Sequence, residues 1–218
     1  MTTQATKVPF YSNTPDDTHC FQAVFRMILG YYQPERDFSW EELDTLSAKQ
    51  EGMATWPQAM LSAMEALGFD ITMVEGFDGH AFIERGGAYL QEAFGSEIAK
   101  WQIENSNIDD ERELYKKAYS SGVDIQNRIP NIEDLKDYMA QGYFVACNVN
   151  SSKLNQKPGY VGHFILILDI TDQEIVMHDP GLPAMPERHV GLDLFEQAWA
   201  DPNDAARNFV AIRPKEKA

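Results

Sequence analysis

Residues 17–32 read DTHCFQAVFRMILGYY, and this stretch predicts the first helix of the fold. Its apolar residues recur at intervals of three and four, the spacing of a helix that packs one face on a core. Gly30 and then Pro34 mark its end. Cys20 is therefore expected in the first turn of a buried helix. The apolar positions are Phe21, Val24, Phe25, Ile28 and Leu29, and the candidate cap residues are Asp16, Asp17 and Thr18.

The remaining sequence predicts an α+β fold, with a helix at the start and a mainly antiparallel sheet at the end. Residues 75–128 are polar and punctuated by glycine, with helical patterns near 88–101 and 110–119. We expect them to form a helical insertion within one domain spanning residues 1–218. Further helices are expected at 39–48, 56–67, 132–140 and 193–200, and strands at 69–74, 143–149, 163–170, 174–179 and 209–212.

The charge of the chain restricts its partners. Thirty-four acidic side chains against 18 basic ones give the 218 residues a net charge of −16. Such a field repels nucleic acid and anionic membranes, which need Lys and Arg to displace counterions. It favours a neutral or cationic substrate, although acidity also simply keeps a protein in solution.

The first residues, 1–8, lack the apolar core of a signal peptide, and the longest apolar run is too short to cross a bilayer. A cytoplasmic location is expected. The chain has two cysteines, Cys20 and Cys147, which a cytosolic protein seldom pairs, although a disulfide between them stays open. Cys147 lies within an alternating strand pattern, which favours core packing.

Two C-terminal strands carry His163 and Asp179, and the turn between them decides whether the two side chains share a face. Side chains alternate along a strand, so His163 shares a face with Ile165 and Ile167, and Asp179 with Met177. A three-residue turn at 170–172 would put His163 directly opposite Asp179, within hydrogen-bonding reach. A two-residue turn would put them on opposite faces, and the turn residues do not decide between the two registers.

Cys20, His163 and Asp179 are the three groups that a thiol nucleophile needs. A helix N-terminus favours the thiolate and lowers a cysteine pKa. His163 can take the thiol proton, and Asp179 can fix the ring in the tautomer that faces the sulfur. The sequence therefore predicts nucleophilic catalysis by Cys20.

The run 17–32 resembles the catalytic helix of the double-glycine, bacteriocin-processing cysteine peptidases, which form family thirty-nine of the cysteine peptidases within the papain-like superfamily. Residues 162–169, GHFILILD, and 175–181, IVMHDPG, are similar to the histidine strand and the aspartate-proline motif of that family. Residues 131–149 resemble the helix and strand before the histidine. The likeness covers about half of the chain. It implies a papain-like fold and cleavage of an amide bond by Cys20, His163 and Asp179, without a cofactor.

Two positions depart from the pattern of that family. Phe21 follows the cysteine, where the family usually has glycine. Thr14 stands six residues before the cysteine, where the family has the glutamine that completes the oxyanion hole. The nearest amide is Asn13, so Asn13 and the Cys20 backbone N–H are the expected oxyanion donors.

Other interpretations stay open at this level. The acyl-thioester could be resolved by an amine, which would make the protein an acyl or amide transferase. The protein could also be a peptide-binding module that has lost the chemistry. A zinc site built from His19, His163, His178 and His189 is disfavoured because no pair has compact ligand spacing. His178 should point away from Asp179, and Trp56 is expected to start a helix and could lie near a substrate cleft.

Overall fold

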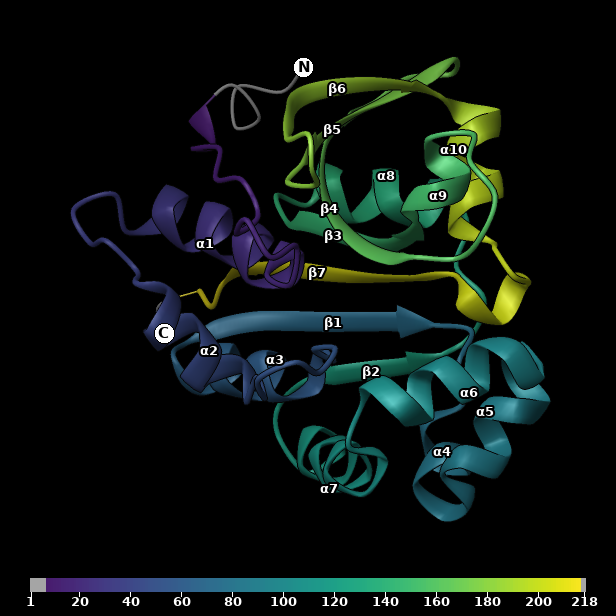
Figure 1. Cartoon of the computed structure of the whole chain (residues 1–218). Helices are drawn as coiled ribbons and strands as arrows, with labels where there is room; N and C mark the ends of the chain where they lie inside the picture. Colours follow the sequence, from purple (N-terminus) through teal and green to yellow (C-terminus); the bar gives the residue numbers. More distant parts are fainter. Residues whose placement is uncertain (1–6, 217–218) are drawn as a thin grey trace.

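A computed structural model describes residues 7–216, and within them seven strands form one sheet in the order β2-β1-β7-β3-β4-β5-β6 (Figure 1). All neighbouring strands are antiparallel except β1 and β2, which are parallel. The expected α+β class is confirmed. The strands are β1 Phe69–Glu75, β2 Asp124–Asn127, β3 Phe144–Asn150, β4 Gly162–Ile170, β5 Glu174–Asp179, β6 Met185–Gly191 and β7 Asn208–Pro214.

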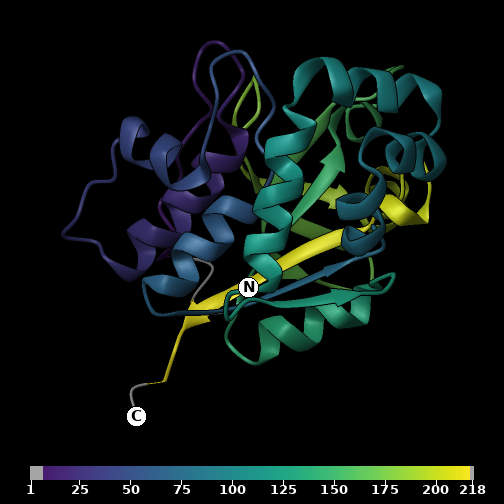
Figure 2. The ribbon, with the colours of Figure 1, turned by 90° about the horizontal axis from the view of Figure 1, so that it is seen from below.

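Helices cover both faces of the sheet. One face packs against α1 (Cys20–Tyr32), α2 (Trp40–Ser47) and α3 (Gln58–Ala66). The other packs against α8 (Ile132–Ala140), α9 (Ser151–Leu154) and α10 (Leu192–Trp199). Figure 2 shows α1–α3 gathered at one end of the molecule and α4–α6 at the other. Two buried faces explain why β3, β4 and β5 read as nearly continuous apolar runs.

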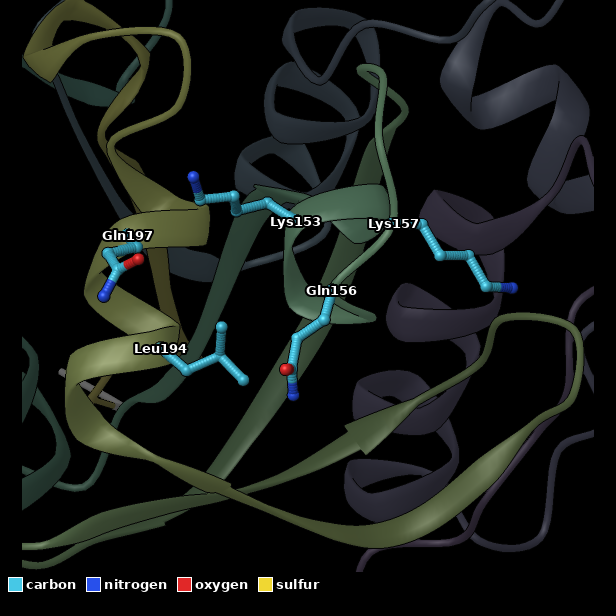
Figure 3. A pocket seen from close by; sticks show the side chains of 5 residues that line it. All are labelled: Lys153, Gln156, Lys157, Leu194 and Gln197. Atoms are coloured by element: carbon cyan, nitrogen blue, oxygen red, sulfur yellow. The ribbon is translucent and has the colours of Figure 1, made fainter.

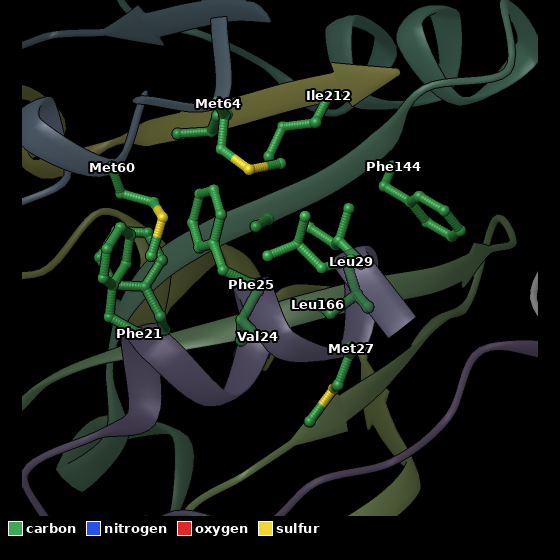
Figure 4. Close-up of a cluster of buried hydrophobic side chains, with 14 of the residues drawn as sticks. Phe21, Val24, Phe25, Met27, Leu29, Met60, Met64, Phe144, Leu166 and Ile212 are labelled. Carbon is green, nitrogen blue, oxygen red and sulfur yellow. The ribbon is translucent and has the colours of Figure 1, made fainter. Parts of the chain in front are cut away.

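The apolar stripe of α1 packs on the centre of the sheet, as expected. Phe21 and Phe25 lie in contact at 4.6 Å between ring centres, and Phe21 also meets Phe164 of β4 at 4.8 Å. Figure 4 shows the stripe facing Leu166 of β4 and Ile212 of β7, with methionines of α3 closing the cluster. Each fully buried side chain of this size contributes about 1.5–3 kcal/mol. This burial fixes the helix against the sheet and so fixes the position of its first residue.

The expected cap of α1 is wrong. The N-cap residue is His19, and its side chain makes no cap hydrogen bond. Asn13 Oδ1 instead accepts from the His19 backbone N–H at 2.7 Å. Asp16 and Thr18 are hydrogen bonded to each other, and Asp17 accepts from the Asn13 amide, so local polar contacts outcompete capping.

The expected insertion at 75–128 needs correction at both boundaries. Its helices are α4 Gly79–Arg85, α5 Gly87–Phe94, α6 Ser96–Asn105 and α7 Ile108–Tyr119. Glu75 closes β1, however, and Asp124–Asn127 pairs with β1 as the edge strand β2. A four-residue polar edge strand carries too little hydrophobic alternation to be found from sequence. The edge strand β6, mostly exposed and containing Pro186, was missed for the same reason.

Aromatic side chains form a separate small core for the insertion. Trp56, which precedes α3, stacks on Phe82 of α4 at 5.1 Å between ring centres. Two carboxyls are buried beside this core, Glu75 and Glu111. Burial raises the pKa of Glu75 to about 8, only partly opposed by the Tyr115 hydroxyl that donates to it at 3.2 Å. Burial, with a smaller effect of Asp110, raises the pKa of Glu111 to about 8.

These buried carboxyls predict a stability that falls with rising pH. An unfolded Glu ionises near its ordinary pKa of 4.5, whereas Glu75 in the folded chain ionises at about 8. Between these values the folded state binds more protons than the unfolded state, so their contribution is complete below pH 4.5 and lost as the pH rises to 8. We expect Glu75→Gln to raise the Tm at pH 8 and to change it little at pH 4.5, as measured by thermal unfolding.

The shift at the higher pH should reach several degrees, since 1 kcal/mol moves the Tm of a domain of this size by roughly 2–4 °C. Glu97→Gln, an exposed change on α6, is the matched control and should leave the Tm unchanged at both pH values. Equal shifts at both pH values for Glu75→Gln would contradict this account.

Candidate active site

Cys20 is the first residue of α1, and its thiol lies beside the ring of His163 at the start of β4. The thiol is half-buried and free, and it is hydrogen bonded to His163. Burial raises the pKa of Cys20, but the hydrogen bond and charge of His163 outweigh it, with help from the backbones of Phe164 and Phe21. The pKa of the thiol is therefore lower than its ordinary value, and the thiolate is favoured.

His163 is buried and joins the thiol to Asp179. Its Nε2 lies 2.7 Å from Asp179 Oδ1, which leaves Nδ1 for the thiol. Burial lowers the pKa of His163, but Asp179 and Cys20 together raise it to about 10. A low thiol pKa and a high imidazole pKa describe a thiolate–imidazolium pair, which is the form needed for attack on a carbonyl.

Of the two turn lengths that the sequence left open, the β4–β5 hairpin has the shorter one. The turn has two residues, Asp172 and Gln173, because the Thr171 backbone N–H donates to the Glu174 carbonyl at 2.9 Å. That turn alone would place His163 and Asp179 on opposite faces. A β-bulge between Ile167 and Asp169 adds one residue to β4 and shifts the pairing by one. The two side chains therefore share a face as diagonal neighbours, and they meet without being directly opposite.

Arg188 of β6 completes the site and was not found from the sequence. Its Nη1 donates to Asp179 Oδ2 at 2.7 Å, and its Nη2 donates to the Leu154 carbonyl at 3.1 Å and to Asn155 Oδ1 at 2.9 Å. Burial raises the pKa of Asp179, but His163, Arg188 and the Gly181 N–H lower it to about 2. The only sequence signal was an arginine nine residues after the aspartate, in a segment not recognised as a strand.

Gly181 provides the space that this arrangement needs. A Cβ at this position would lie 3.0 Å from Asp179 Oδ1 and 3.4 Å from His163 Nε2. The glycine N–H also donates to Asp179 Oδ1 at 2.9 Å. A side chain here would press on the hydrogen bond between the histidine and the aspartate.

Asn13, the expected oxyanion donor, lies in the loop that leads into α1. Its backbone N–H donates to the Pro180 carbonyl at 2.8 Å, which ties the loop to the end of β5. Its Oδ1 accepts from the His19 N–H, and its Nδ2 donates to Asp17 Oδ1 at 2.6 Å. An amide nitrogen carries two hydrogens, so one remains for a ligand.

The residues at the two unusual positions have structural roles. Phe21 is buried among aromatic rings of the α1 core. The Thr14 hydroxyl lies 2.7 Å from His19 Nδ1, and His19 in turn approaches Asp44 of α2 at 3.1 Å. These contacts hold the loop before the helix.

Other candidates lie elsewhere. His178 packs edge-on against Phe10 and accepts from the Glu187 N–H, on the face opposite Asp179. Cys147 is fully buried on the α8 side, where burial raises its pKa, and it is not bonded to Cys20. Trp56 belongs to the insertion core. Within residues 7–216, no group of three His, Cys, Asp or Glu is close enough to hold a metal ion.

A surface pocket between α9 and α10 is separate from this site (Figure 3). It is lined by Lys153, Gln156, Lys157, Leu194 and Gln197. Neither Cys20 nor His163 is among the lining residues.

No known protein family matches the sequence, and no curated protein matches it. Among solved structures, the chain is similar to the peptidase domain of Streptococcus ComA, a bi-functional ABC transporter involved in a quorum sensing pathway. The alignment covers 94% of this chain and 98% of that chain, with 11% identity and a TM-score of 0.49. The function of this chain is therefore argued from its own residues. None of the helices in residues 7–216 has the length and apolar run required to span a bilayer.

The contact between Arg188 and Asp179 predicts a measurable change in acidity. Arg188→Met removes a hydrogen bond and a positive charge, so the pKa of Asp179 should rise from about 2 toward 3.8. The stability that Asp179 contributes is present above pH 3.8 and lost as the pH falls toward 2, and the variant should lose part of it. An NMR titration of the carboxyl carbon measures this pKa. Arg207→Met, which removes a contact to Asp204 instead, is the control, and an unshifted pKa in Arg188→Met would refute the role given to Arg188.

Proposed function

We propose that this protein is a cysteine hydrolase that cleaves a peptide or other amide bond through an acyl-thioester intermediate. The observation that carries the proposal is the continuous hydrogen-bonded chain from Cys20 through His163 to Asp179, with the sulfur at the start of a buried helix. The likeness of residues 17–32, 162–169 and 175–181 to the double-glycine cysteine peptidases supports it, and so does the papain-like order of helix, strand and aspartate.

The reaction begins when the Cys20 thiolate attacks the carbonyl carbon. The new C–S bond converts the carbonyl oxygen to an oxyanion, which the Cys20 backbone N–H and Asn13 Nδ2 stabilise. The imidazolium of His163 gives its proton to the leaving nitrogen, the C–N bond breaks and an amine departs. Water then gives a proton to His163 and attacks the thioester, the C–S bond breaks, and a carboxylic acid leaves while the thiolate–imidazolium pair is restored.

Asp179 and Arg188 act through the histidine. The carboxylate holds Nε2 and stabilises the positive charge that the ring carries before the amine leaves. Arg188 keeps that carboxylate ionised and oriented. The chain therefore alternates thiolate, imidazolium, carboxylate and guanidinium, and each charge lies against one of opposite sign.

The net charge of −16 suits a neutral or cationic peptide, as the sequence predicts. A cytoplasmic location is part of the same proposal.

Selective alkylation tests the nucleophile directly. At about pH 6, iodoacetamide should modify Cys20 and not Cys147, because only a thiol with a lowered pKa is appreciably ionised there. Peptide mapping by mass spectrometry identifies the modified residue, and Cys147 serves as the internal control because it is buried with a raised pKa. His163→Ala should slow the reaction of Cys20 strongly. Equal alkylation of Cys20 and Cys147 by iodoacetamide would contradict the proposal.

The pH dependence of turnover should be bell-shaped. Activity should rise as Cys20 ionises, with a midpoint below its ordinary value of 9.0, because His163 lowers the pKa of the thiol against the effect of burial. It should fall as the imidazolium loses its proton, at about pH 10. Alkylation by iodoacetamide requires only the thiolate. Its rate should therefore rise with pH as Cys20 ionises and should not fall again near pH 10.

Substitutions should show that Cys20, His163 and Asp179 act together, so that the losses of activity are not additive. Cys20→Ala should abolish turnover of a peptide substrate, and His163→Ala should lower it by roughly 10²–10⁴-fold. Asp179→Asn should cost less, since it keeps the hydrogen-bonding shape and removes only the charge. The double variant Cys20→Ala with His163→Ala should cost little more than either alone. Cys147→Ala is the control with retained activity, and full activity of Cys20→Ala would place the chemistry elsewhere.

A further inference from the structure

His178 of β5 is a buried histidine on the face of the sheet opposite Asp179. Phe10, in the loop that precedes α1, packs edge-on against its ring at 5.1 Å between ring centres. Nδ1 of the ring accepts from the Glu187 backbone N–H at 3.2 Å, so this nitrogen carries no proton. Burial lowers the pKa of His178, against smaller opposing effects of the Val8 backbone and the Glu187 carboxylate. The ring is therefore a neutral hydrogen-bond acceptor for β6.

The N–H that it accepts belongs to a bulge between β5 and β6. Between its flanking pairs β6 has one residue more than β5, so Pro186 and Glu187 both stand opposite His178. Proline has no N–H, and Glu187 has a left-handed backbone with a φ of 50°. The His178 side chain supplies the acceptor for the one N–H at this interruption of the ladder. Bulges are frequent next to active sites, where they redirect a side chain.

Arg188 is the residue directly after the bulge. Its guanidinium donates to Asp179 Oδ2 at 2.7 Å, and its other nitrogen is held at the end of α9. The direction in which its side chain leaves the strand is set by the backbone of Glu187. A residue with a side chain is strained in the left-handed region, and it persists there only when its surroundings hold it. The bond to His178 holds Glu187 in this conformation and so holds the starting point of the Arg188 side chain.

We propose that His178 is a positioning residue that acts through the bulge to aim Arg188 at Asp179. The ring touches neither the substrate nor the reacting atoms. It fixes the backbone from which the guanidinium extends, the guanidinium orients the carboxylate, and the carboxylate holds the imidazolium. The catalytic consequence rests on the function proposed above, whereas the effect on Asp179 does not.

Three substitutions of His178 separate its hydrogen bond from its packing. In asparagine, Oδ1 takes the place of Nδ1, so His178→Asn keeps the acceptor and loses most of the ring. His178→Leu and His178→Phe keep apolar bulk against Phe10 and lose the acceptor. An NMR titration of the Asp179 carboxyl carbon reports whether Arg188 still holds the carboxylate.

The hydrogen bond predicts a specific order among the variants. His178→Leu and His178→Phe should raise the pKa of Asp179 from about 2 toward 3.8, and His178→Asn should leave it at about 2. In an Arg188→Met background, His178→Leu should add no further shift, because its effect passes through the guanidinium. His189→Leu is the matched control, since it is the same substitution at an exposed residue of β6 that contacts Glu174, and it should leave the pKa unchanged.

The reactivity of Cys20 should follow the same order. A carboxylate that is less well held stabilises the imidazolium of His163 less, and the imidazolium is what lowers the pKa of the thiol against burial. The midpoint pH of alkylation by iodoacetamide should therefore rise in His178→Leu and His178→Phe and stay at the parental value in His178→Asn.

Several results would overturn the proposal. An Asp179 pKa that is unchanged in both apolar variants, or raised equally in His178→Asn, would assign the ring to packing alone. A further shift by His178→Leu in the Arg188→Met background would show that the effect does not pass through Arg188. An unchanged alkylation midpoint in both apolar variants would show that the effect ends at the carboxylate. If one apolar variant does not fold, the other carries the test.

Failure of the proposed function is a separate result. An unreactive Cys20 in the parent protein would remove the proposed function, whereas the titration of Asp179 would still decide whether His178 positions Arg188.

Discussion

Burial of α1 on the centre of the sheet is the constraint on which the site depends. The helix places apolar side chains against β4 and β7, and it cannot rotate or slide without exposing them. Its first residue is Cys20, so the same packing that stabilises the core also fixes the sulfur beside His163. Phe21 shows the coupling most directly, because it packs on Phe164, whose backbone contacts the sulfur. The position of the sulfur is thus a product of hydrophobic packing, and its lowered pKa comes from the groups that the packing brings beside it.

Those charges are arranged so that no ionised group is buried alone. Asp179 is buried, but it accepts from His163, from Arg188 and from the Gly181 N–H. A buried carboxylate with three donors stays ionised, and its charge then holds the imidazole protonated. Glu75 shows the opposite case in the same protein. Among residues 7–216 its side chain has one hydroxyl donor and no cation beside it, and its pKa rises to about 8. The number and charge of the partners, more than burial, separates an ionised carboxyl from a neutral one.

The helix, the main strands and the order of cysteine, histidine and aspartate could be predicted from the sequence because each rests on local periodicity. The parts that could not be predicted depend on contacts between distant segments. Arg188 lies in a polar edge strand without a clear alternation, and nothing local shows that it reaches Asp179. The hydrogen bond from the His19 N–H to Asn13 Oδ1 was missed because it joins residues six positions apart. The register of the hairpin could not be decided for a related reason, since neither the turn length nor the bulge is encoded by alternation alone.

The bulge between Ile167 and Asp169 has a consequence for how this hairpin can vary. Side-chain direction in a strand has only two values, so each added or removed residue inverts the face of everything beyond it. With the two-residue turn alone, His163 and Asp179 would lie on opposite faces of the hairpin. The extra residue at the bulge returns them to the same face. A change of one residue in the loop is therefore tolerable only together with a change at the bulge, whereas a change of two residues leaves His163 and Asp179 on a common face. Insertions and deletions in this hairpin should consequently be found in even steps or as compensated pairs.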